Sequence, residues 1–389
     1  MPILNEGNFP FINSTLELSK QVEYRPSTFY WTLRPWGTYD YWYCEILIGK
    51  WFEDNDIELL TGSDVLNKIK TDDNTFLVIC NSHEAFHSVV EPIYKGLIIK
   101  KQIPPHKIIL LSESATVHQE VERVSKNYNC RPIQVEWTLV FEKNVRIDLE
   151  NKEIIPKRID PNKHYLKKFL NLNRRWRLHR PTFVAFLYIY KLLDYGYVSL
   201  GCSDDGRNWQ NMFQWMLSEH ISDSEFYNLL IAHRQSIQQI TDLYLDTEDL
   251  KTNRARLSCS LDDFYQSSYF SIVSETNFYT GPNKESGVFL SEKTFKPIAH
   301  FHPFMVISVP GTLEKLKELG YKTFHPFIDE SYDSESNDFE RLRKILKEVS
   351  RLSKMPPEDV SNFIKHTAYI TEHNFNILKN KTNHIYKTL

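Results

Sequence analysis

The amino-acid sequence predicts an α/β protein with two domains, and three observations support this prediction. The chain has 389 residues, which is too long for a single ordinary hydrophobic core. Of these residues 41% are hydrophobic, which is enough to form two cores. Short apolar segments of strand length recur in both halves, separated by stretches long enough for helices. Residues 144–163 are polar and contain Pro156 and Pro161, so we place the boundary there and expect domains at residues 1–155 and 156–389.

The first half alternates predicted strands with a predicted helix. The strands cover residues 41–49, 76–80, 107–111 and 133–141. Residues 85–100 suit a helix that Pro92 bends or starts, because proline has no amide hydrogen to donate. Residues 144–163 lack helical periodicity, so no helix is expected at the boundary.

The second half opens with residues 165–173 and a basic run at residues 174–180. Pro181 suits the first position of a helix, Phe183 and Phe186 line one face of it, and Gly196 ends it. Further helical patterns cover residues 209–230, residues 339–353 and the segment after Pro356-Pro357.

Residues 269–324 are the most informative part of the chain. The apolar run at 270–273 predicts a buried strand that ends in Ser274-Glu275. Ser291 is a good N-cap for a helix that begins with Glu292-Lys293. A second apolar run covers 304–309, and Pro310-Gly311 leads into another helix. Polar groups therefore gather at the end of a predicted parallel strand, where open α/β sheets bind ligands.

Four of these motifs carry a family resemblance: Ser274-Glu275, Ser291-Glu292-Lys293, Pro303-Phe304 and Gly311. Together they resemble the donor-binding half of GT-B glycosyltransferases, and most closely the α-1,3-fucosyltransferase family, although Ser291 stands where that family usually has threonine. A resemblance to glycosyltransferase-like proteins of bacteriophages and large DNA viruses is carried by residues 293–297, 319–324 and 329–333. The resemblance implies two Rossmann-like domains that face each other across a cleft, with a nucleotide sugar bound by the second.

Composition excludes several other classes. Lys and Arg total 47 against 50 for Asp and Glu, so the net charge gives no reason to expect a polyanionic partner. Five cysteines without a Cys-x-x-Cys pair favour reduced thiols. The N-terminal residues lack a signal-peptide pattern, and no stretch approaches the ~20 apolar residues of a membrane span, so we expect a soluble cytoplasmic protein.

A nucleotide-sugar donor needs cations for its diphosphate and a carboxylate for its ribose. The chain has only 12 glycines and neither a G-x-G-x-x-G nor a P-loop motif, so charge must replace a glycine cradle. The candidate cations are Arg174, Arg180, Lys293 and Lys296. Glu292 is the candidate ribose acceptor, and the alternative for it is a first-turn glutamate that stabilises the helix dipole. For the arginines, the alternative is a basic surface patch.

Two further groups complete the predicted site. Glu275, Asn277 and Tyr279 follow the strand at 270–273, where the resemblance places contacts to the donor, with turn capping as the alternative. An inverting transfer also needs a base on the first domain, and Glu113, His83 and Glu84 follow predicted strands there. We expect no cofactor and no essential metal, because lysine and arginine can neutralise the departing diphosphate.

We therefore predict a metal-independent glycosyltransferase that moves a sugar from a nucleotide sugar to a hydroxyl acceptor such as a glycan. One alternative is the same fold acting on modified DNA bases, which the phage resemblance and the basic run permit. A second alternative is a zinc hydrolase, because His83-Glu84-Ala85-Phe86-His87 has the form H-E-x-x-H. The third histidine and the glycine of the longer metzincin motif do not follow it.

Overall fold

The computed structural model describes residues 29–36, 39–46, 63–73, 75–81, 89–173, 176–201, 208–218, 224–240, 243, 245, 262–280 and 287–381. They form two compact units. Unit 1 comprises the described residues up to Lys143 together with Gly287–Phe289, and unit 2 comprises those from Asn144 to Lys381 without these three. Each unit contains a sheet with parallel strands, so the predicted α/β class with two Rossmann-like domains is confirmed.

The sheet of unit 1 has five strands in sequence order, β1-β2-β3-β4-β5. These are β1 (Phe29–Trp36), β2 (Tyr39–Ile46), β3 (Thr75–Asn81), β4 (Ile108–Ser112) and β5 (Gln134–Trp137). β1 pairs antiparallel with β2, and the remaining neighbours pair in parallel. The helical segments are α4 (Ser63–Thr71), α5 (Val90–Pro92), η3 (Ile93–Lys100), η4 (Pro105–Lys107) and α6 (Val117–Asn127). Apolar side chains of α4, α5, η3 and α6 share one core with β3, β4 and β5.

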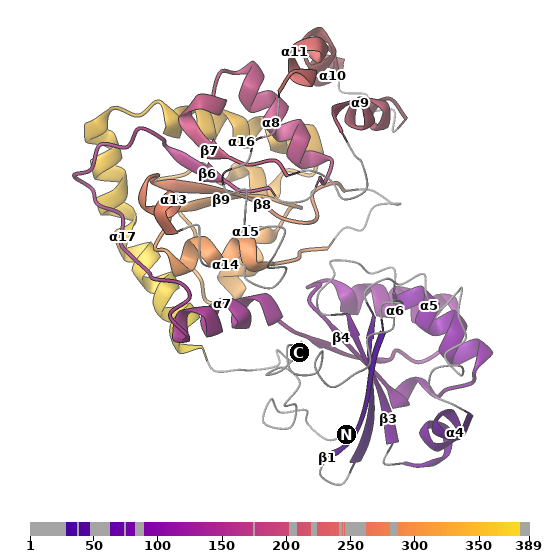
Figure 1. Cartoon of the computed structure of the whole chain (residues 1–389). Helices are drawn as coiled ribbons and strands as arrows, with labels where there is room; N and C mark the ends of the chain where they lie inside the picture. The colour runs from indigo at the N-terminus through magenta and orange to yellow at the C-terminus, as the bar shows by residue number, and fades with distance from the viewer. Residues whose placement is uncertain are drawn as a thin grey trace. The chain divides into compact units, whose positions relative to one another are not determined.

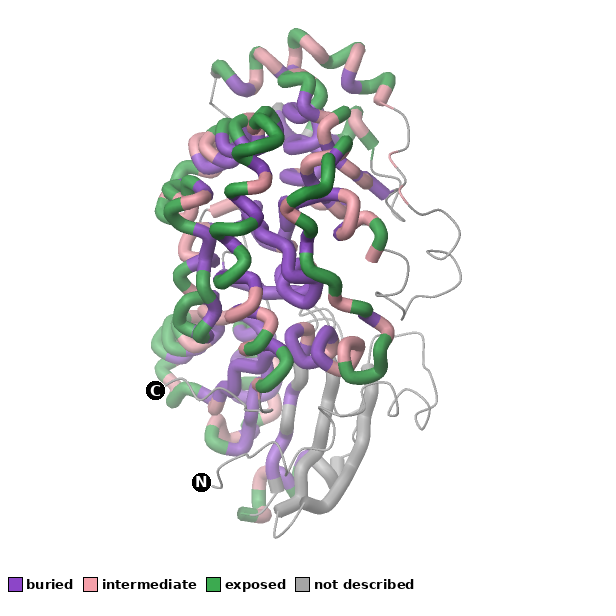
Figure 2. The backbone as a smooth tube through the Cα atoms, turned by 90° about the vertical axis from the view of Figure 1, so that its left-hand side faces the viewer, coloured by how far each residue is buried: buried purple, intermediate pink, exposed green. Residues whose placement is uncertain are grey.

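The sheet of unit 2 has four parallel strands in the order β7-β6-β8-β9. They are β6 (Phe169–Asn171), β7 (Gly196–Val198), β8 (Phe270–Ser274) and β9 (Phe304–Ile307). All residues of β6, β8 and β9 are buried, which is expected for parallel strands with both faces covered. Figure 2 shows this buried sheet in purple, while the surrounding helices alternate between buried and exposed residues.

Helices cover both faces of the unit 2 sheet. In Figure 1, α8 (His179–Ile189) and α16 (Asp338–Ser353) lie on one face, and α14 (Glu292–Ala299) and α17 (Pro357–Asn380) lie on the other. The remaining helical segments are α7 (Val140–Glu150), η5 (Leu193–Tyr195), α9 (Trp209–Ser218), α10 (Ser224–Ala232), α11 (Arg234–Gln238), α13 (Asp262–Gln266), α15 (Thr312–Glu318) and η6 (Ser331–Ser334). None of the described helices combines the length and apolar character needed to cross a bilayer.

Within the helical region predicted at residues 209–230, the described residues form α9 and α10. Two local predictions were wrong. A helix, α7, runs through residues 140–150, where we expected an irregular boundary and, up to residue 141, a strand. Gly196 does not end α8, which stops at Ile189; instead it begins β7. A Cβ at Gly196 would lie 2.1 Å from the ring of Phe169 on β6, so this glycine permits close strand packing.

Candidate functional site

The strand order of unit 2 reverses between β6 and β8. From β6 the chain passes through α8 to β7 on one side, and then returns to β8 on the other side of β6. Ligands of open α/β sheets bind at the carboxyl ends of the strands beside such a reversal. In the described part of unit 1 the strands follow one another without a reversal. The geometry therefore directs attention to the carboxyl ends of β6 and β8.

Two buried asparagines connect these strand ends. The Nδ2 of Asn171 donates to the carbonyl of Ile272 at 2.7 Å and to the Oγ of Ser274 at 3.2 Å. The Nδ2 of Asn173 donates to the Oδ1 of Asn171 at 2.6 Å. Within the described residues the Oδ1 of Asn173 accepts no hydrogen bond, and the residue is fully buried. An unpaired buried acceptor is costly, which makes this edge of the sheet a candidate place for a ligand donor group.

The carboxylate of Glu275 orders the start of α14. It accepts from the amide of Ser291 at 3.0 Å, from the Oγ of Ser291 at 2.6 Å and from the Oγ1 of Thr294 at 2.6 Å. Ser291 is the N-cap, as its sequence position predicts, and its Oγ accepts from the amide of Lys293. The negative charge of Glu275 at a helix N-terminus is electrostatically favourable. Its side chain therefore joins the end of β8 to the first turn of α14.

Glu292 and Lys293 form an ion pair in that first turn. The Nζ of Lys293 lies 2.9 Å from the Oε1 of Glu292 and 3.1 Å from the Oγ of Ser291. The two side chains are 15% and 23% exposed, so neither extends into bulk solvent. Burial alone would raise the pKa of Glu292, but the charges of Lys293 and Lys296 lower it to about 2. Glu292 is therefore ionised at neutral pH.

The first turn of α8 meets the same strand end. The Nη2 of Arg180 donates to the carbonyls of Ser274 at 2.9 Å and Glu275 at 3.1 Å, although the arginine is only 2% exposed. The Nε2 of His179 lies 2.9 Å from the Glu275 carbonyl. Burial, and then the neighbouring charges of Arg180, Arg177 and Arg341, lower the pKa of His179 well below its usual range. His179 is therefore neutral and donates from Nε2 to this carbonyl.

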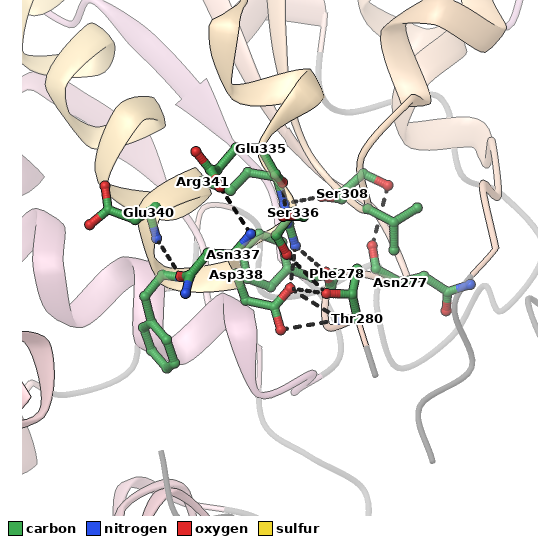
Figure 3. Close-up of polar contacts among 12 residues, drawn as sticks. Asn277, Phe278, Thr280, Ser308, Glu335, Ser336, Asn337, Asp338, Glu340 and Arg341 are labelled. Carbon is green, nitrogen blue, oxygen red and sulfur yellow. Dashed lines mark hydrogen bonds and ion pairs between the residues drawn. The ribbon is translucent and has the colours of Figure 1, made fainter. Parts of the chain in front are cut away.

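The segment after Glu275 packs against His179. The ring of Phe278 stacks on His179 with 5.4 Å between centroids, and the ring of Tyr279 meets it edge-on at 6.2 Å. Burial raises the pKa of Tyr279, which therefore remains a protonated phenol. Asn277 is buried, and in Figure 3 its side-chain amide points away from α16.

Seven of the predicted donor-binding residues thus lie within one connected region of unit 2. They are Arg180, Glu275, Asn277, Tyr279, Ser291, Glu292 and Lys293. With Asn171, Asn173, His179, Ser274 and Thr294 they form what we call the switch-point cluster. Whether these residues contact a donor stays a prediction.

The remaining predicted residues are Lys296, Glu113, Arg174, His83 and Glu84. Lys296 is buried, and its charge acts on Asp148, Asp262 and Glu292. Glu113 is buried in unit 1 after β4, and its Oε1 accepts from the amide of Phe141 at 3.0 Å, which caps the start of α7. Arg174, His83, Glu84 and the zinc-motif His87 fall outside the described residues. Among the described residues there is no group of three His, Cys, Asp or Glu that could hold a metal ion.

Sequence reasoning missed part of the cluster. Asn171 and Asn173 follow an apolar run in the sequence Phe169-Leu170-Asn171-Leu172-Asn173, which is a signal of the same kind as Ser274-Glu275 after β8. His179 and Thr294 gave no such signal, because their roles depend on contacts with Glu275, 96 and 19 residues away along the chain.

Comparison with known proteins adds little to this geometry. No protein-family model matches the chain, and no curated protein matches it by sequence. Among solved structures, the chain is similar to a UDP-forming α,α-trehalose-phosphate synthase from Burkholderia xenovorans. The identity is 10% and the TM-score 0.36, over 79% of this chain and 72% of the synthase chain. A similarity at this level carries no functional argument, so the function has to be argued from the site.

The chemistry of the switch-point cluster suits an anionic, hydroxyl-rich ligand. An ionised glutamate beside a lysine can accept from a hydroxyl while the ammonium faces an oxygen anion. Helix α8 begins at the same place, and Arg180 adds a fixed positive charge. A neutral histidine and a protonated tyrosine add polar groups that carry no charge.

Proposed function

We propose that this protein is a glycosyltransferase and that unit 2 binds its nucleotide-sugar donor at the carboxyl ends of β6 and β8. One observation carries the proposal. The strand-order reversal of unit 2 coincides with a cluster that contains the half-buried Glu292–Lys293 ion pair and the buried Arg180. The sequence resemblance to α-1,3-fucosyltransferases assigns donor contacts to the same Glu-Lys pair, and the resemblance and the topology therefore support the same place.

In this proposal each charged group has a separate task. Glu292, held ionised, accepts from the ribose hydroxyls of the donor. Lys293 stabilises the diphosphate, and its charge becomes more valuable as negative charge develops on the leaving group. Arg180 holds the end of β8 and adds positive potential without leaving its carbonyl partners. The acceptor base stays a prediction at Glu113, His83 and Glu84.

Binding of nucleoside diphosphates tests this proposal. Wild-type protein is titrated with UDP, GDP, CDP and ADP, and its melting temperature is recorded with each at saturation. We expect one of them to raise it by roughly 5–10 °C, because a ligand at about 100 times its Kd stabilises by ~2.7 kcal/mol. Lys293→Ala should weaken the binding of that nucleotide about 10- to 100-fold, since it removes a charge-assisted contact.

Lys365→Ala is the matched control. Lys365 is exposed on α17 in the same unit, and its removal changes the net charge by the same amount. This variant should bind the nucleotide like the wild type. The proposal fails if no nucleotide shifts the wild-type protein, or if both lysine variants bind equally well.

A further inference from the structure

Arg341 on α16 is a large charged side chain that is only 1% exposed. Its Nε donates to the carbonyl of Ser308 at 2.9 Å, and its Nη1 donates to that of Glu335 at 2.8 Å. Its Nη2 donates to the carbonyl of Phe278 and to the Oδ1 of Asp338. Burial of a guanidinium costs free energy unless its N–H groups are hydrogen-bonded. The acceptors of Arg341 are therefore held in place by these bonds.

Two of these partners belong to neighbouring strands. Phe278 follows β8 and Ser308 follows β9, so Arg341 links the carboxyl ends of both strands. Asp338 extends the link, because its carboxylate accepts from the amide of Thr280 at 3.1 Å and from its Oγ1 at 2.9 Å. The Oγ of Ser308 donates to the carbonyl of Asn277 at 3.2 Å.

Residues 277–280 are therefore held through backbone groups of three of their four residues. Figure 3 shows Asp338 and Arg341 facing this segment from the first turn of α16, with Asn337 capping the helix beside them. We call the pair Asp338 and Arg341 the α16 clamp. It restrains the backbone of the segment, while the side chain of Asn277 points away from α16.

The clamp also reaches the switch-point cluster through stacked rings. The guanidinium carbon of Arg341 lies 4.5 Å from the centroid of the Phe278 ring, and that ring stacks on His179. His179 in turn contacts the carbonyl of Glu275. Displacement of Arg341 would therefore move Phe278. It would also change how Phe278 packs against His179 at the end of β8.

We propose that Arg341 is a positioning residue that holds residues 277–280 in the conformation that binds the donor before the donor arrives. This inference rests on the proposed function, since it names the segment that the donor meets. Preorganisation of a binding segment raises affinity because less conformational entropy is lost on binding. A guanidinium is needed because lysine cannot donate to four acceptors in a fixed plane.

Arg341→Lys tests the proposal, and Arg343→Met, which removes an exposed arginine of the same helix, is the control. Arg343 lies on the same helix and pairs with Glu340, but its side chain is 59% exposed. For each protein, calorimetry measures the Kd of UDP, GDP, CDP and ADP, and hydrogen exchange measures the amide protection of residues 277–280. We expect Arg341→Lys to weaken nucleotide binding about tenfold, equivalent to ~1.4 kcal/mol, and to speed exchange within residues 277–280.

Arg343→Met should leave both measurements unchanged. Wild-type affinity in Arg341→Lys would overturn the proposal. So would faster exchange throughout unit 2, because Arg341 would then support the whole unit and not this segment. If the wild-type protein binds no nucleotide, the proposed function and the donor role fail together, and exchange still decides whether the clamp restrains the segment.

Thr280→Val provides a second variant if Arg341→Lys does not fold. It removes the Oγ1 that donates to Asp338 and to the carbonyl of Ser336, and it keeps the shape of the side chain. The backbone amide of residue 280 can still donate to Asp338. We expect a smaller loss of affinity in the same direction, about threefold, and unchanged affinity would overturn the proposal.

Discussion

Individual histidines in unit 2 are held in the neutral state by their surroundings. The Nε2 of His302 lies 3.0 Å from the carbonyl of Ser268, to which it donates, and its Nδ1 accepts from the Oγ of Ser271 at 2.7 Å. His300 stacks on Tyr265 with 4.1 Å between ring centroids and lies 3.4 Å from Asp262. Burial, followed by His302 and Lys296, lowers the pKa of His300 to about 3. The contact with Asp262 therefore involves a neutral imidazole.

This depressed pKa predicts a pH-dependent loss of stability that depends on His300. In the unfolded chain the residue takes up a proton near pH 6.5, whereas in the folded protein it does so near pH 3. The neutral state contributes stability above pH 6.5, and this contribution is lost as the pH falls toward 3. The slope is about 1.4 kcal/mol per pH unit.

His300→Phe keeps an aromatic ring against Tyr265 and removes the titration. Urea unfolding between pH 6.5 and 4.5 should therefore show a wild-type stability that declines more steeply than that of the variant, by up to ~3 kcal/mol over this range. Parallel curves for the two proteins would show that His300 does not titrate as described.

At the scale of secondary structure, caps and close packing decide where each element begins. Helix α14 begins at Ser291 because both the serine and Glu275 take its first donors, and α16 begins after Asn337, which accepts from the amides of Phe339 and Glu340. The first residue of β7 is a glycine, Gly196, because the ring of Phe169 leaves no space for a side chain there.

Two glycine-to-alanine variants separate packing from backbone strain. Gly196→Ala should destabilise unit 2 by about 1–3 kcal/mol, because its Cβ would overlap the Phe169 ring and push β7 away from β6. Gly311 has φ +80°, with no atom within 4 Å of an added Cβ, so Gly311→Ala should cost about 1 kcal/mol from strain alone.

Denaturant unfolding measures both values. Phe169→Leu should partly restore the stability of Gly196→Ala, since it replaces the ring that the new methyl group meets with a smaller side chain. It should not restore the stability of Gly311→Ala. Equal losses in the two glycine variants would contradict the packing explanation.

At the scale of the whole molecule, the chain contains two units that each have their own sheet and core. Unfolding of such proteins is commonly not a two-state process. The switch-point cluster belongs entirely to unit 2, so a ligand bound there stabilises that unit directly.

Calorimetry should therefore resolve two unfolding transitions, of which a saturating nucleoside diphosphate raises mainly one. Lys293→Ala should remove this shift and leave the other transition where it was. A single transition that moves as a whole with ligand would show that the two units unfold together.

The sequence predicted those features that depend on neighbouring residues. Strands β3, β4, β8 and β9 are continuous apolar runs, which parallel strands covered on both faces require. The N-cap at Ser291 depends on its own side chain and the next turn. Helix α7 was missed because residues 144–163 are polar and lack helical periodicity, with Val145, Ile147 and Leu149 at every second position.

By itself, the sequence determined the α/β class, the buried strands β8 and β9 and the Ser291-Glu292-Lys293 turn, because local hydrophobic pattern and capping specify each of them. Only the tertiary structure decided which strand ends meet, since a reversal of strand order joins segments about 100 residues apart. The same holds for Arg341, whose partner Phe278 lies 63 residues away. A buried guanidinium binds whichever carbonyls the fold brings to it, and no local pattern specifies those.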